Sequence, residues 1–146
     1  MQISNYLTNE HRNCDDLFAK AEKLAVERNW EECEKSFLEF ADATLLHFEK
    51  EERELFPEFE AITGSDEGPT RVMKYEHDQV RGLFSKMAEA VENRDRDAYL
   101  SLSESMMILL QQHNMKEEQM LYAMCDRVMS PPKRAETVEK MEAVKR

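Results

Sequence analysis

Every histidine of this chain belongs to a twofold internal repeat, which limits the fold more than any other feature. The histidines lie at positions 11, 47, 77 and 113, so a shift of 66 residues places His11 on His77 and His47 on His113. The same shift superposes other identical residues: Glu10 and Glu76, Leu17 and Leu83, Phe18 and Phe84, Lys50 and Lys116, Glu51 and Glu117, Glu52 and Glu118, and Leu55 and Leu121. This internal duplication predicts two equivalent halves related by a pseudo-twofold axis.

Residues that interrupt helices are rare, which favours an all-α fold. Only three glycines and four prolines occur among 146 residues, and the chain is rich in Glu, Lys, Leu, Met and Ala. We expect a first helix that is capped by Ser4 or Thr8 and ends near Val26, then helices over about residues 31–60, 69–92 and 97–129. Their short connections predict an up-down-up-down antiparallel four-helix bundle.

The length of the chain fits a single domain. We expect the bundle to occupy residues 1–129, because Pro131 and Pro132 end the regular pattern. Residues 130–146 are charged and carry a weak apolar stripe, which is typical either of a C-terminal tail or of a short packed helix.

Charge and hydropathy exclude several classes of protein. The net charge of −11 argues against a nucleic-acid partner, because affinity for phosphates comes from a basic surface. No stretch reaches the ~20 apolar residues of a membrane span, and residues 1–10 lack the features of a signal peptide. Cys14, Cys33 and Cys125 form no CxxC pair and are expected to be reduced thiols. We therefore expect a cytoplasmic protein without a membrane partner.

Two of the histidines open the pattern His-x-x-x-Glu-Glu, at residues 47–52 and 113–118. Because residues i and i+4 of a helix face the same way, each pattern presents an imidazole and a carboxylate on one face. The other two histidines lie on apolar stripes, so their rings should point into the core. Six donors are then expected to converge inside the bundle: His11, His47, Glu51, His77, His113 and Glu117.

Six donors are too many for one tetrahedral zinc ion and divide naturally between two metal ions, with the glutamates bridging. Two divalent cations would also supply the positive charge that buried carboxylates need. Mixed imidazole and carboxylate donors favour iron, with manganese or zinc as lesser alternatives. We expect Glu52 and Glu118 to lie on a solvated face. Glu118 is the less favoured alternative to Glu117 as a metal ligand.

The order His, His-x-x-x-Glu, His, His-x-x-x-Glu resembles the hemerythrin-like (HHE cation-binding) family, and the resemblance extends from about Glu10 to Asp126. It implies a four-helix bundle around a non-haem di-iron centre. His11 and His47 would then bind one iron, and His77 and His113 the other. By the same resemblance, Glu51 and Glu117 would bridge the two iron ions together with an oxo or hydroxo group.

The chain differs from the oxygen-carrying members of that family in its last two motifs. The carriers close with His-x4-Asp, whereas this chain closes with His113-x-x-x-Glu117. Those proteins have a His-x-x-x-His pair on the third helix, whereas here its first position is Met73. Four histidines instead of five leave open positions on both iron ions, which favours reaction with dioxygen, peroxide or nitric oxide. The pattern resembles the proteins that repair iron–sulfur clusters under oxidative and nitrosative stress. The alternatives are a dioxygen-binding storage or sensing protein, and a regulatory bundle with a structural metal and an unknown protein partner.

Overall fold

A computed structural model describes residues 2–146 and confirms the all-α bundle. Among these residues there is no β-strand. The elements in chain order are α1 (Ile3–Val26), α2 (Trp30–Lys50), the π-helical turn η1 (Glu51–Leu55), α3 (Phe56–Thr63), α4 (Pro69–Glu92), α5 (Arg96–Lys116), the π-helical turn η2 (Glu117–Leu121), α6 (Tyr122–Val128) and α7 (Pro131–Glu142).

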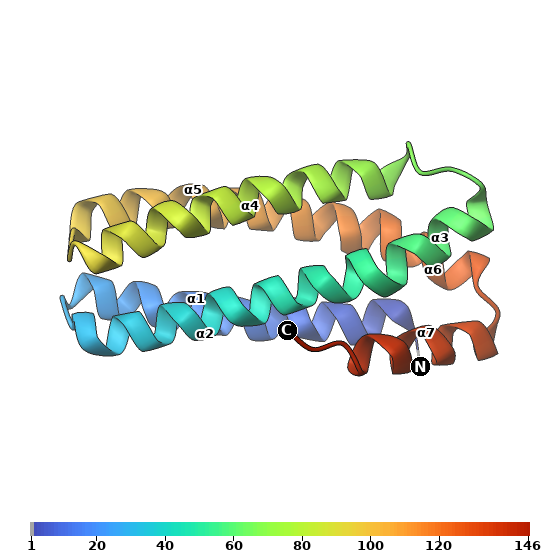
Figure 1. Cartoon of the computed structure of the whole chain (residues 1–146), viewed down its shortest axis with the longest axis horizontal. Helices are drawn as coiled ribbons and strands as arrows, with labels where there is room; N and C mark the ends of the chain where they lie inside the picture. Colours follow the sequence, from blue (N-terminus) through green and yellow to red (C-terminus); the bar gives the residue numbers. More distant parts are fainter. Residues whose placement is uncertain (1) are drawn as a thin grey trace.

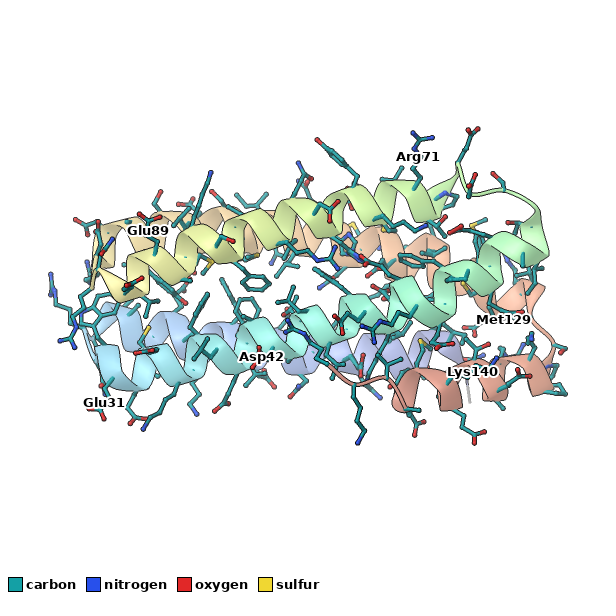
Figure 2. The ribbon with its side chains drawn as sticks, viewed as in Figure 1. Glu31, Asp42, Arg71, Glu89, Met129 and Lys140 are labelled. Carbon is teal, nitrogen blue, oxygen red and sulfur yellow. The ribbon has the colours of Figure 1, made fainter. Side chains whose placement is uncertain are left out.

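The helices form two antiparallel pairs, α1 with α2 and α4 with α5 (Figure 1). The pairs join through contacts of α2 with α4 and of α1 with α5 and α6, which closes the ring of four. In Figure 2 the side chains of both pairs fill the space between them, whereas Glu31 and Glu89 project outward at one end. The observed topology is the predicted up-down-up-down order.

The first helix of each half ends in the same backbone conformation. Arg28 and Arg94, which are 66 residues apart, both have positive φ angles, of 57° and 52°, directly after the first helix of each half. The start of α1 differs from our prediction, because neither Ser4 nor Thr8 precedes it. The backbone N–H groups of Ile3 and Ser4 instead donate to the Asp126 carboxylate on α6, at 2.8 and 3.2 Å.

A π-helical turn follows the glutamate of each His-x-x-x-Glu motif, in η1 and in η2. A π turn has i→i+5 hydrogen bonds and so adds one residue to the turn, and such turns often occur at functional sites. The helix axis continues through both turns, and Pro57 lies in the first turn of α3. The extra residue changes which side chains beyond the motif face the interior.

The apolar core is divided into two clusters. The larger lies between the four helices toward the α1–α2 and α4–α5 connections and includes Phe37, Phe40, Phe84 and Tyr99. The smaller lies toward the other end and consists of Ile3, Leu7, Leu55, Phe56, Phe59, Met73, Leu121, Tyr122, Cys125, Met129, Val138 and Met141. The four histidines lie between the clusters along the helices, so apolar side chains separate them from water on both sides.

Residues 131–142 form the helix α7. One side of this helix is buried and carries Thr137, Val138 and Met141. This helix lies against η1 and α1 (Figure 1) and adds two side chains to the smaller cluster. Its first turn is capped by the Ser130 hydroxyl, which accepts from the backbone N–H of Lys133 at 3.3 Å. In residues 2–146 no helix has the length and apolar character needed to cross a membrane.

Candidate metal centre

The structure brings the six expected donors together in one buried layer. They come from every long helix of the bundle: His11 from α1, His47 from α2, Glu51 from η1, His77 from α4, His113 from α5 and Glu117 from η2. All six side chains are buried. Two overlapping groups of donor atoms lie close enough to hold a metal ion, namely Glu51, His77, His113 and Glu117 in one group and His11, His47 and Glu117 in the other.

Each carboxylate lies between the two histidine pairs. Glu51 Oε1 is 3.4 Å from His47 Nε2 and 3.2 Å from His77 Nε2. Glu117 Oε1 is 3.2 Å from His113 Nε2 and 3.1 Å from His11 Nε2. Each glutamate thus contacts a histidine of each pair and lies where a carboxylate could bridge two cations.

The other ring nitrogen of every histidine contacts a further carboxylate, and we call these four the backing carboxylates. The Nδ1 distances are 2.7 Å from His11 to Glu118, 2.8 Å from His47 to Glu10, 2.6 Å from His77 to Glu52 and 2.8 Å from His113 to Glu76. An ionised carboxylate only accepts hydrogen bonds, so each Nδ1 carries the proton. In a neutral ring Nε2 then presents its lone pair to the interior, as in metal-bound histidines.

Glu52 and Glu118 are partly exposed, which agrees with the predicted solvated face, but each also holds a histidine, which we did not predict. Glu10 and Glu76 were not predicted to act at the site. Two sequence signals could have identified them: each directly precedes a histidine, and they are superposed by the 66-residue repeat. The i+4 rule does not find them because their histidine partners lie on other helices.

Lysine and arginine side chains neutralise three of the backing carboxylates. Lys50 donates to Glu10, and Lys116 donates to Glu76 in the same way. Arg81 donates to both oxygens of Glu52, at 2.9 and 3.1 Å. The residue equivalent to Arg81 in the first half is Asp15, so the repeat does not supply an arginine to Glu118.

The buried carboxylates and imidazoles strongly perturb one another. Burial raises the pKa of Glu51, and the neighbouring Glu117 charge raises it further. Burial also opposes ionisation of Glu117, but the positive charge of His113 and hydrogen bonds hold its pKa well below the ordinary value. Burial would lower the pKa of His113, but Glu117 dominates and raises it to about 9. Despite burial, the carboxylates likewise raise the pKa of His47 and His77, which favours the protonated imidazoles beside them.

Several interior atoms fit a metal ion and little else. Among residues 2–146, Glu51 Oε1, His77 Nε2, His113 Nε2 and Glu117 Oε2 are buried without a hydrogen bond of acceptable geometry. All four belong to the four-residue donor group. Buried polar atoms normally have partners, and a cation bound by their lone pairs would satisfy all of them together. The four-residue group thus fits a divalent cation, and His11, His47 and Glu117 provide a second group of donor atoms.

Tyr122 also contacts the donors, and our prediction from the sequence did not include it. Its hydroxyl donates to Glu51 Oε2 at 2.6 Å and lies 2.9 Å from Glu117 Oε1. Tyr122 follows Glu117 by five residues, which on an α-helix corresponds to a rotation of about 140° away from the same face. The π-helical turn η2 between them returns Tyr122 to that face. No motif in the sequence indicates such a turn.

The sequence model of the hemerythrin HHE cation-binding domain matches residues 2–125. No curated protein and no solved structure matches the chain significantly.

Proposed function

The chain belongs to the hemerythrin HHE cation-binding family, and on that premise we propose that it is a non-haem di-iron protein that binds or reacts with small oxidants. The observation that supports this most strongly is the convergence of four imidazole Nε2 atoms and two carboxylates in a dry layer. In the proposed centre His11 and His47 hold one iron, His77 and His113 hold the other, and Glu51 and Glu117 bridge them.

The donor chemistry favours iron over the alternatives. Imidazole and carboxylate together suit iron, whereas a structural zinc site would be closed by four ligands, usually including cysteine. The three free cysteines are buried, and none is in either donor group. Zinc and manganese are the lesser candidates because they accept the same donors.

Iron would supply exchangeable coordination positions and electrons, which dioxygen, peroxide and nitric oxide all require. The residues of the chain orient the donors and keep water away. The backing carboxylates fix each imidazole ring through Nδ1. Phe48 stacks on His77 with ring centroids 3.8 Å apart, so the imidazole is covered by an apolar surface. This apolar cover favours small apolar ligands over water.

Met73 supports a reactive centre rather than a carrier. It lies one turn before His77 on α4 and is buried in the smaller apolar cluster. The oxygen carriers have a histidine at this position, and its replacement by Met leaves one protein donor fewer. We propose that the reaction serves the response to oxidative or nitrosative stress, including repair of iron–sulfur clusters, in the cytoplasm.

Metal analysis of protein purified without added metal tests the di-iron centre. We expect two iron ions per chain and the near-ultraviolet absorption of an oxo-bridged pair in the aerobic protein. Two equivalents of zinc without colour would overturn the proposal in favour of a structural metal site.

Stopped-flow mixing of the reduced protein with dioxygen separates reaction from storage. We expect oxidation without a stable adduct in the parent protein. Met73→Ala is the matched control for Met73→His, which restores a fifth histidine and is expected to prolong the lifetime of an adduct. A stable, reversible adduct in the parent protein would favour the storage or sensing alternative.

A further inference from the structure

The two halves of the site differ at one aromatic position. The shift of 66 residues places Phe56 on Tyr122, so one half has a phenyl ring where the other has a phenol. The two rings are placed alike: Tyr122 lies 5.6 Å from the His11 ring with an interplanar angle of 30°, and Phe56 lies 5.8 Å from the His77 ring at 21°. The hydroxyl group is therefore the main chemical difference between the two positions.

The Tyr122 oxygen is surrounded by acceptors. Besides the two carboxylate contacts described above, it lies 3.1 Å from His11 Nε2 and 3.4 Å from His47 Nε2. A phenol has one proton to donate, so at most one of these four neighbours receives a full hydrogen bond. With both imidazole rings neutral, as metal binding requires, the remaining lone pairs face the phenol oxygen without a proton between them, and a cation in their midst relieves this repulsion.

Tyr122 also completes the smaller donor group. The group at His77 and His113 contains four protein donors, whereas the group at His11 and His47 contains three. The Tyr122 oxygen lies within 3.4 Å of a donor atom of each of those three residues. With Glu51 and Glu117 both bridging, each cation has four protein donors, and the Tyr122 oxygen adds a fifth only at His11 and His47.

We propose that the Tyr122 oxygen is a ligand of the cation held by His11 and His47, and that exogenous molecules therefore bind at the cation held by His77 and His113. Ligation requires the phenol to release its proton to solvent as the metal binds. At the second cation the equivalent space is bordered by the Phe56 ring, which has no donor atom. This inference rests on the proposed di-metal centre and makes its two halves unequal.

The surroundings of the second cation agree with this assignment. Phe48 and Phe56 both stack on the His77 ring, with centroid distances of 3.8 and 5.8 Å. The residue equivalent to Phe48 in the other half is Asn114, which is partly exposed. The His77 side therefore presents apolar rings and no further protein donor, which suits a diatomic molecule as the additional ligand.

Visible absorption and resonance Raman spectra of the ferric protein test the ligation. A phenol oxygen bound to ferric iron gives an intense charge-transfer band and tyrosine ring vibrations in resonance. We expect both in the parent protein and neither in Tyr122→Phe, with two iron ions per chain retained in each. Phenylalanine already occupies the equivalent position in the other half, so this variant is compatible with the fold. An unchanged spectrum in Tyr122→Phe would overturn the proposal.

Phe56→Tyr is the matched control for the exchangeable position. It places a hydroxyl beside His77 and His113, so we expect a stronger charge-transfer band. We also expect azide binding to weaken by at least about tenfold, or about 1.4 kcal/mol, because the added phenol oxygen would occupy the open position. Azide affinity equal to that of the parent would refute the assignment of the open position.

These experiments separate the inference from the proposed function. A charge-transfer band in a protein that does not react with oxidants would support Tyr122 ligation and contradict the function. Reaction with dioxygen by a protein without the band would support the function and contradict Tyr122 ligation.

Discussion

Replacing one backing carboxylate should weaken metal binding without removing a metal ligand. Glu76 accepts from His113 Nδ1 at 2.8 Å and from the Lys116 ammonium group through its other oxygen. In Glu76→Gln one of these oxygens becomes an NH₂ group, which only donates. Either the His113 N–H or the Lys116 ammonium group then faces a donor instead of an acceptor.

The expected loss follows from the known effect of such outer contacts. Removing the partner of a metal-bound histidine typically lowers metal affinity by ~10–100-fold, or about 1.4–2.7 kcal/mol. Glu76 is buried, so water does not readily replace the lost acceptor. We therefore expect an effect near the upper end of this range.

Titration of the metal-free protein with iron(II) or zinc(II) against a chromophoric chelator would measure the change. Glu10→Gln is the internal replicate, because Glu10 contacts His47 and Lys50 in the equivalent geometry. Glu60→Gln is the control, because Glu60 pairs with Lys74 at 2.9 Å near the surface and contacts no histidine. We expect this control to leave affinity unchanged. Equal affinities of the parent and both site variants would refute the role of the backing carboxylates.

Three further outcomes concern stability. Removing the metal with a chelator should lower the free energy of unfolding by about 5 kcal/mol, if the free metal concentration was about 100 times the dissociation constant of both sites. Calorimetry would record this loss as a Tm lower by roughly 10–20 °C. A Tm that does not depend on metal would contradict the site. Asp126→Ala should lower the free energy of unfolding in urea by about 1–2 kcal/mol, because the backbone N–H groups of Ile3 and Ser4 at the start of α1 lose their acceptor. An unchanged free energy of unfolding would contradict this capping role. Phe40→Ala should lower the free energy of unfolding by about 3–5 kcal/mol, because Phe40 is fully buried between Phe18 and Phe84. The metal content should remain unchanged. Loss of metal would show that the larger apolar cluster and the metal site are not independent.

Local patterns were sufficient to predict the bundle and the convergence of six histidine and glutamate side chains in its interior. Helix periodicity places residues i and i+4 on one face, so the pairing of His47 with Glu51 and of His113 with Glu117 is readable from spacing alone. The 66-residue repeat then relates the two halves. The extents of the four long helices follow from the positions of the glycines, prolines and short polar breaks, which act on the backbone locally.

The remaining features depend on contacts between distant segments. Asp126 caps α1 from 122 or more residues away, and Glu10 reaches His47 from a neighbouring helix. Such pairs depend on how far one helix is shifted and rotated against another, which the packing of whole cores determines. The chain between 131 and 142 becomes a packed helix because η1 and α1 cover its apolar side.

The inequality of the two halves has the same origin. The repeat in the sequence predicts equal half-sites, but Tyr122 differs from Phe56 and Arg81 from Asp15. These differences affect the site only through the tertiary structure. The π-helical turn rotates Tyr122 onto the donors, and the packing of α4 brings Arg81 to Glu52. Periodicity along one helix defines which face a side chain occupies, whereas the contacts on that face are defined by the partner helix that packs there.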